Sequence, residues 1–260
     1  MSHYATLQTK TESGVHTILL NRPEKRNALT PELMEELTQA LEAAEANRHC
    51  RVVIVTGAGS AFCAGLDLEV LKTGMAGTAA DYEADAERVA RMFRTLYGMG
   101  KPTIAAVNGP AIAGGMGIAT LCDFTLAVPE AKFGYTEVRI GFIPAIVSVY
   151  LRTQVGEKRA RELLLTGRII GAEEAQALGL VTRVVPEPEL MREAHALAEK
   201  LTRNSPAAME ATKCLLLRFA DRHLADDVDA AIRASVQMRG HEDFREGVAA
   251  FLEKREAGWR

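Results

Sequence analysis

The sequence has little of what several classes of protein require. Its 260 residues include four cysteines, none in a CxxC spacing, and no cluster of cysteine and histidine has the spacing of a zinc site. The most apolar stretch, residues 103–128, is interrupted by Asn108, Pro110 and Asp123, so we expect it to be buried in a core and not in a membrane. The first residues contain no apolar run typical of a signal peptide. These absences predict a cytoplasmic protein with free thiols and no metal site.

Positive charge is not in excess either. The net charge is −3, which argues against a nucleic acid or an anionic membrane as the main partner, since either would require a basic face. An anionic ligand would therefore be bound by local lysine and arginine residues or by main-chain N–H groups.

What is present is an ordinary globular composition, with 48% hydrophobic and 25% charged residues, and a pattern that alternates between strands and helices. Thr30 followed by Pro31 is typical of a helix start. We divide the chain into a core, residues 1–200, and a helical C-terminal region, residues 201–260. Strands are predicted at residues 15–21, 52–55, 103–107, 124–128 and 179–185, and helices at residues 31–49, 81–97, 114–122, 157–165, 172–178, 189–203, 206–220, 224–238 and 242–256.

Two similar loops, residues 56–65 and 108–113, each follow a buried strand, and the second leads into Gly114 and Gly115. Such a loop leaves free N–H groups at the start of the next helix. The small residue Ala64 in one loop, and Gly114 with Gly115 after the other, would let a substrate approach the main chain closely. Two N–H groups facing one point would form an oxyanion hole, in which each donor contributes about 3–4 kcal/mol to transition-state stabilisation. The alternative is that the glycines serve only tight turns and helix packing.

Glu137 is the carboxylate with the most unusual surroundings. Apolar residues and glycines flank it in residues 133–144, so burial beside a pocket is plausible and would raise its pKa toward the range useful for general acid/base catalysis. Arg139, two residues away, could counter that shift, and a solvated surface glutamate is the alternative. The first glycine loop lacks GxGxxG, which disfavours a nucleotide-binding dehydrogenase.

Longer motifs follow one another along nearly the whole chain. The segments are Asn21–Leu29, Ala61–Leu68, Lys101–Gly109, Gly114–Gly115, Cys122–Asp123, Phe133–Pro144, Leu165–Arg168, Ala177–Val181 and Phe251–Arg255. Through these segments the sequence resembles the crotonase (enoyl-CoA hydratase/isomerase) superfamily. The resemblance implies an α/β fold, a spiral of ββα repeats with a helical C-terminal region that mediates trimerisation, as a trimer or a dimer of trimers.

The resemblance also implies an acyl-CoA thioester as substrate, with coenzyme A as part of that substrate and no separate cofactor. The two oxyanion-hole N–H groups fall on Ala64 and Gly114, and the catalytic carboxylate falls on Glu137. Residues expected to bind the substrate are Lys25, Arg26, Ala28, Gly65, Leu66, Asp67, Leu68, Gly115, Phe251 and Lys254.

The sequence departs from the family pattern at Gly117, where many hydratases carry a second catalytic glutamate. Three interpretations remain open. An enoyl-CoA hydratase is favoured by the local similarity around Glu137, whereas Gly117 favours a Δ3-Δ2-enoyl-CoA isomerase that uses Glu137 as a proton shuttle. The third is a non-catalytic acyl-CoA-binding protein. We expect residues 70–82 to shape the acyl pocket.

Overall fold

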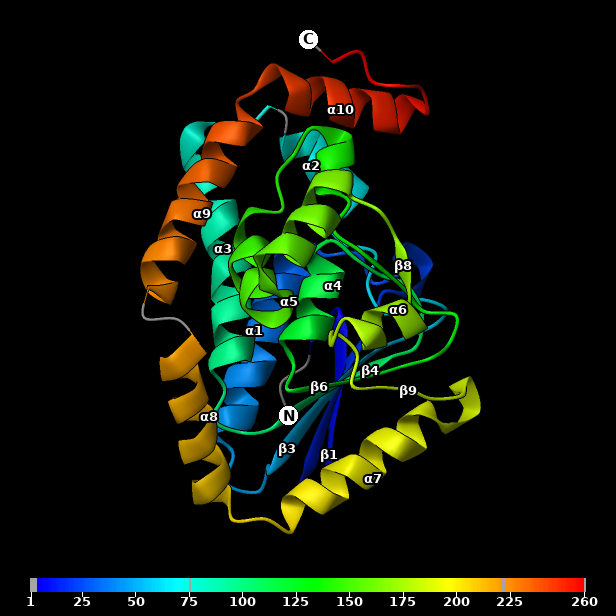
Figure 1. Ribbon diagram of the computed structural model, residues 1–260, viewed down its shortest axis with the longest axis vertical. Helices are drawn as coiled ribbons and strands as arrows, with labels where there is room; N and C mark the ends of the chain where they lie inside the picture. Colours follow the sequence, from blue (N-terminus) through cyan, green and yellow to red (C-terminus); the bar gives the residue numbers. More distant parts are fainter. Residues whose placement is uncertain (1–3, 75, 221–222, 260) are drawn as a thin grey trace.

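A computed structural model describes residues 4–74, 76–220 and 223–259 (Figure 1). Its main sheet has six strands in the order β1-β2-β3-β4-β6-β9. The first pair is antiparallel and every other pair is parallel, as expected for strands linked by helical crossovers. The strands are β1 (Leu7–Glu12), β2 (Val15–Leu20), β3 (Val52–Gly57), β4 (Thr103–Val107), β6 (Phe124–Ala127) and β9 (Arg183–Val184).

A second, three-stranded sheet has the order β5-β7-β8, made of β5 (Ala111–Ile112), β7 (Lys132–Gly134) and β8 (Ile170–Gly171). β5 pairs in parallel with β7, so Ile112 lies opposite Gly134. Helix α4 (Gly114–Leu121) begins two residues after Ile112, and the 3-10 helix η2 (Glu137–Ile140) begins three residues after Gly134. The small sheet therefore brings the start of α4 and the start of η2 to the same edge.

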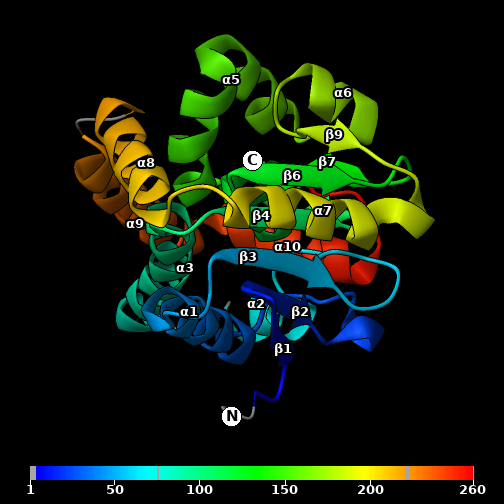
Figure 2. The ribbon, with the colours of Figure 1, turned by 90° about the horizontal axis from the view of Figure 1, so that it is seen from below.

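Helices cover the main sheet. Helix α1 (Pro31–Ala46) begins where Thr30 Oγ1 accepts the Leu33 N–H, and α3 (Ala79–Gly98) begins at a capping box between Thr78 and Asp81. Figure 2 shows α7 (Leu190–Thr202) lying across the sheet. Helices α1 and α3 lie beside the end of the sheet that is formed by β1, β2 and β3. The main-sheet strands β3 and β4 are buried along their whole length.

Three C-terminal helices run along one side of the molecule and across one end (Figure 1). They are α8 (Pro206–Ala220), α9 (Leu224–Arg239) and α10 (Glu242–Glu253). α9 packs on α3 and on α5 (Ala145–Thr166), whereas α10 packs on η2 and on α2 (Leu68–Gly74). The division proposed at residue 200 falls in the last turn of α7, which ends at Thr202.

Several elements differ from the sequence prediction. α5 begins at Ala145 and not near residue 157, because it is two helical stretches joined at Gly156, whose φ of 76° breaks the periodic pattern. β1 and α2 were not predicted. β9 is two residues long and is preceded by α6 (Ala172–Ala177). Within the described ranges, no helix is at once long and apolar enough for a membrane span.

Candidate active site

The loop that follows β3 is held by hydrogen bonds from Asn27, which is completely buried. The Asn27 Nδ2 donates to the carbonyl oxygens of Ala58 (2.9 Å) and Ala61 (2.8 Å), and its Oδ1 accepts the Arg22 N–H (2.9 Å). Arg26 and Asn27 both have a left-handed backbone, with φ of 51° and 53°. This conformation turns the chain sharply after η1 (Pro23–Lys25) and brings it against the loop.

The expectation that the Ala64 amide is a free oxyanion donor is wrong. The Ala64 N–H donates to the Arg26 carbonyl oxygen at 3.0 Å, so this amide is already paired within the fold. The turn at Arg26 and Asn27 is what presents that carbonyl to the loop. A substrate oxygen could use the Ala64 N–H only by displacing an internal hydrogen bond, which leaves the Arg26 carbonyl without its partner.

A free amide lies two residues further on, at Leu66. The Gly65 carbonyl accepts the Leu29 N–H (2.7 Å) and the Asp67 N–H donates to the Leu29 carbonyl (2.9 Å). In a trans peptide the carbonyl and the next N–H point in opposite directions, so the Leu66 N–H points away from Leu29. Among the described residues it has no hydrogen-bond acceptor.

The second glycine loop packs directly against the first, next to Leu66. A Cβ placed on Gly65 would lie 3.0 Å from the Ile112 carbonyl oxygen and 3.0 Å from Ala113 Cβ. A Cβ on Gly115 would lie 2.2 Å from the Cys63 carbonyl oxygen. The two loops are thus in backbone contact, and glycine is required at both positions for that approach.

The second free amide belongs to Gly114, the first residue of α4. The first N–H groups of a helix have no acceptor within it, and they carry the positive end of the helix dipole. Ala113 precedes it with φ of 51° and ψ of −121°, a conformation that alanine rarely adopts. The Ala113 N–H is held by the Gly134 carbonyl oxygen at 2.7 Å, which fixes this strained residue and with it the direction of the Gly114 N–H.

Glu137 is the acidic group of the site. The residue is half-buried overall, but its Oε2 is fully enclosed and has no hydrogen-bond partner among the described residues. Burial raises the pKa of the Glu137 carboxyl from 4.5 to about 7, and its own main-chain N–H offsets part of the shift. Arg139 is exposed and is not among the groups that shift this pKa, so the expected compensation does not occur.

Gly117 faces an apolar wall. A Cβ on Gly117 would lie 2.8 Å from Phe93 Cζ and 2.9 Å from Val147 Cγ1. Phe93 comes from α3 and Val147 from α5, and both are buried. The volume that a longer side chain at position 117 would need is therefore filled by hydrocarbon.

Known proteins are similar to this chain in sequence and in fold. A family model described as enoyl-CoA hydratase/isomerase matches residues 10–260. A protein of Thermus thermophilus with enoyl-CoA hydratase in its name is 46% identical over 93% of this chain and 95% of its own. The crotonyl-CoA hydratase of Syntrophomonas wolfei is 33% identical over 98% of both chains. The crystal structure of an enoyl-CoA hydratase/isomerase from Xanthobacter autotrophicus superposes with a TM-score of 0.89, at 33% identity, over 97% of this chain and 98% of that one.

The chain belongs to the enoyl-CoA hydratase/isomerase family. The fold implied by the resemblance, an α/β spiral with a helical C-terminal region, is confirmed. We take the Leu66 and Gly114 amides and the buried carboxyl group of Glu137 as the candidate active site.

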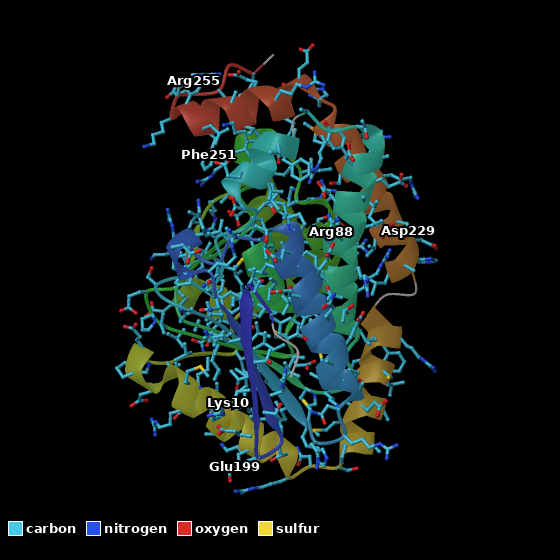
Figure 3. The ribbon with its side chains drawn as sticks, turned by 180° about the vertical axis from the view of Figure 1, so that it is seen from behind. Lys10, Arg88, Glu199, Asp229, Phe251 and Arg255 are labelled. Atoms are coloured by element: carbon cyan, nitrogen blue, oxygen red, sulfur yellow. The ribbon has the colours of Figure 1, made fainter. Side chains whose placement is uncertain are left out.

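The expected substrate-binding residues divide between surface and interior. Lys25, Arg26 and Lys254 are exposed, and Phe251 is 52% exposed on α10 (Figure 3). Ala28, Gly65 and Gly115 are buried against the loops. Leu68 begins α2, and its side chain lies outside the described part of the structure.

Asp67, which we expect to bind substrate, is paired within the fold and supports the loop. It is 5% exposed, its Oδ2 accepts from Arg22 Nη2 at 2.9 Å, and its Oδ1 accepts the Glu69 N–H at 3.0 Å. The ion pair fixes the segment that carries the Leu66 amide, and the second hydrogen bond caps α2.

A cleft of about 280 Å³ lies among the ends of α1, α2 and α3, in the region expected to shape the acyl pocket. Its walls include Val70, Gly74, Tyr82 and Asp85, but none of Leu66, Gly114 or Glu137. The cleft is therefore separate in this structure from Leu66, Gly114 and Glu137.

Proposed function

We propose that this protein is an enoyl-CoA hydratase, which adds water across the C2=C3 bond of a 2-enoyl-CoA thioester. The observation that carries the proposal is the buried, unpartnered Oε2 of Glu137 at the start of η2, at the same edge of the small sheet as the start of α4, where the Gly114 N–H has no acceptor in its helix. A carboxyl group with a pKa of about 7 is suited to both accept and donate a proton near neutral pH. The hydratase names of the similar proteins support the same activity.

In this proposal the thioester oxygen accepts hydrogen bonds from the Leu66 and Gly114 N–H groups. The Glu137 carboxylate takes a proton from water as the resulting hydroxide forms a bond to C3. The C2=C3 electrons move toward the thioester and give an enolate, whose negative oxygen is stabilised by the two amides. The protonated Glu137 then delivers its proton to C2, which restores the carboxylate and completes the addition.

A second candidate activity is Δ3-Δ2-enoyl-CoA isomerisation, favoured by the apolar wall at Gly117. Phe93 and Val147 fill the space that a carboxylate side chain at position 117 would need. Glu137 is then the one carboxylate we assign to proton transfer. Isomerisation needs only one such group, which removes a proton from C2 and returns it to C4, with the same enolate held by the same amides.

The coenzyme A portion of the substrate supplies phosphate groups that require cations. The exposed Lys25, Arg26 and Lys254 are the residues we assign to them. The reaction then requires no cofactor beyond the coenzyme A of its own substrate. The free cysteines support a cytoplasmic location, where thiols stay reduced, and we propose a homotrimer or a dimer of trimers as the assembly.

One assay separates the candidates. The protein is incubated with a 2-enoyl-CoA and, separately, with a 3-enoyl-CoA, while the absorbance of the conjugated thioester is followed. Loss of absorbance with the first substrate and no gain with the second supports the hydratase. The reverse result supports the isomerase. No change with either substrate, despite measurable coenzyme A binding, would contradict both and leave a carrier of acyl-CoA.

A further inference from the structure

Arg239 is a buried arginine outside the groups described so far. It is the last residue of α9 and is 6% exposed. Its Nη1 lies 2.9 Å from Asp85 Oδ2 on α3, and a Cβ placed on Gly74, at the end of α2, would lie 3.3 Å from the same nitrogen. One guanidinium group therefore joins the end of α9 to α2 and α3, and its ion pair with Asp85 spans 154 residues of sequence.

Two aromatic rings flank the guanidinium. Arg239 Cζ lies 5.7 Å from the ring centroid of Tyr82 on α3 and 5.7 Å from that of Phe142, which follows η2. Both distances are within the range of a cation–π interaction. The Phe142 ring also lies 5.1 Å from the ring of Phe244 on α10.

Phe142 is hydrogen-bonded to the main chain of Glu137. Its main-chain N–H donates to the Glu137 carbonyl oxygen at 3.0 Å and closes η2. With only four residues, η2 has little internal support of its own. The position of the Glu137 side chain depends on what holds Phe142 and the turn before it.

Stability alone gives a weak reason for an arginine at this position. Its Nε is buried without a hydrogen-bond partner among the described residues, which costs free energy. Asp85 is also shared, because its Oδ1 binds Arg88 Nη1 at 2.7 Å. Replacing a buried ion pair by apolar residues of similar volume is often neutral or stabilising. A geometric role accounts for the contacts better than a contribution to stability does.

We infer that Arg239 is a positioning residue for Glu137: it fixes the Phe142 ring between α3 and α10 and thereby fixes η2. The inference rests on the proposed function in taking Glu137 as the acid/base. A displacement of about 1 Å at a reacting group can cost about a hundredfold in rate. The residue therefore acts on turnover and leaves the binding of the coenzyme A portion unchanged.

The matched pair of variants is Arg239→Met and Arg88→Met. Figure 3 labels Arg88 where α1 and α3 lie together, and Arg88 pairs with Glu35 and with the same Asp85. The Arg88→Met variant therefore loses an ion pair to Asp85, as Arg239→Met does, but leaves the contact between Arg239 and Phe142 in place. We expect Arg239→Met to lower kcat about ten- to hundredfold with KM nearly unchanged. Arg88→Met keeps the kcat of the wild type, and Arg239→Lys, which keeps the cation, recovers most of the loss.

Amide hydrogen exchange gives a readout that does not require turnover. Residues 138–142 should exchange at least about tenfold faster in Arg239→Met than in the wild type or in Arg88→Met, since their closed state is less populated. Phe142→Leu should give the same change, and the double variant should add little to it. These measurements remain possible if Arg239→Met is unstable, because Arg239→Lys and Phe142→Leu report on the same contact.

The possible failures are distinct. A wild type inactive on both enoyl-CoA substrates overturns the proposed function, whereas the exchange of residues 138–142 still tests the link to Arg239. An active wild type with unchanged kcat and unchanged exchange in Arg239→Met overturns the positioning role. Equal losses in Arg239→Met and Arg88→Met would also overturn it, because they would reflect the shared ion pair only.

Discussion

Burial of Glu137 has two effects: it gives the carboxyl group a pKa suited to catalysis, and it lowers the stability of the folded state when that group is ionised. In the proposed hydration it must be ionised to take a proton from water. With a pKa of about 7, the ionised fraction increases as the pH rises through that value. We expect kcat/KM to increase with pH across about pH 6 to 8 and then level off. A flat profile down to pH 5 would contradict Glu137 as the base.

Replacing this carboxyl group should trade activity for stability. The folded state raises the pKa of Glu137 from 4.5 to about 7, so it favours the protonated carboxyl group. Below pH 4.5 the group is protonated in the folded and the unfolded protein, and it costs no stability. The free energy of unfolding then decreases as the pH rises from 4.5 through about 7. We expect Glu137→Gln to lose nearly all turnover. At pH 8 it should gain up to about 3 kcal/mol in the free energy of unfolding. Urea denaturation at pH 8 and pH 5.5 tests the sign, since the gain must shrink at the lower pH.

The Gly114 amide can be tested by removing its hydrogen. Proline is tolerated at the first position of a helix, which is where Gly114 lies, and it has no N–H. Gly114→Ala is the matched control, because it keeps the N–H while its Cβ meets the same Leu29 side chain, 2.7 Å away at Cδ1. We expect Gly114→Pro to have a kcat about a hundred- to a thousandfold below that of Gly114→Ala. Equal kcat values would remove this amide from the mechanism.

The residue scale also shows what a sequence can and cannot predict. Glu137 and Gly114 could be identified because their neighbours are apolar or glycine. The small side chain of Ala64 and the family resemblance both indicate Ala64 as the donor in the first loop. Which amide is free depends instead on the left-handed turn at Arg26 and Asn27, whose carbonyl takes the Ala64 N–H. That pairing joins segments 38 residues apart, and no local pattern reports it.

At the scale of elements, η2 is fixed by the backbone of α10. A Cβ on Gly247 would lie 2.3 Å from the Ile140 carbonyl carbon, so α10 and η2 touch main chain to main chain. We expect Gly247→Ala to lower the free energy of unfolding by about 1–3 kcal/mol and to reduce kcat, because α10 must move away from η2. Thermal denaturation and the enoyl-CoA assay measure the two effects.

Gly240→Ala is the control for that substitution. Gly240 lies between α9 and α10 with a φ of −79°. A Cβ added to it would lie 3.4 Å from the Gln237 carbonyl oxygen, which is an ordinary van der Waals contact. Its effect on the free energy of unfolding should be within about 0.5 kcal/mol. If Gly247→Ala behaved like Gly240→Ala, the contact between α10 and η2 would not determine the position of Glu137.

Elements were predictable where the periodic pattern is long and capped. α1 follows from Thr30 and Pro31, and its buried side chains recur at helical spacing. β5 and β7 could not be predicted, because two or three residues contain no period. Yet their pairing is what brings Gly114 and Glu137 to one edge. The elements that assemble the site are thus shorter than those that a sequence pattern can identify.

At the scale of the whole molecule, α8 exposes an apolar face. Leu215, Leu216 and Phe219 are 50%, 60% and 73% exposed, and residues three or four apart on a helix are neighbours. Clustered exposed apolar side chains of this kind mark protein interfaces. They are the residues through which we expect the proposed trimer to associate.

Charges placed on this face should separate the subunits. In the Leu216→Glu, Phe219→Glu double variant, association would bury two carboxylates in an apolar contact, which costs several kcal/mol per ion. We expect light scattering to give the mass of a trimer or hexamer for the wild type and of a single chain for the variant. Ala43→Glu, a charge added on the exposed side of α1, should leave the mass unchanged. A variant that kept the wild-type mass would place the interface elsewhere, and a wild type with the mass of one chain would contradict the assembly itself.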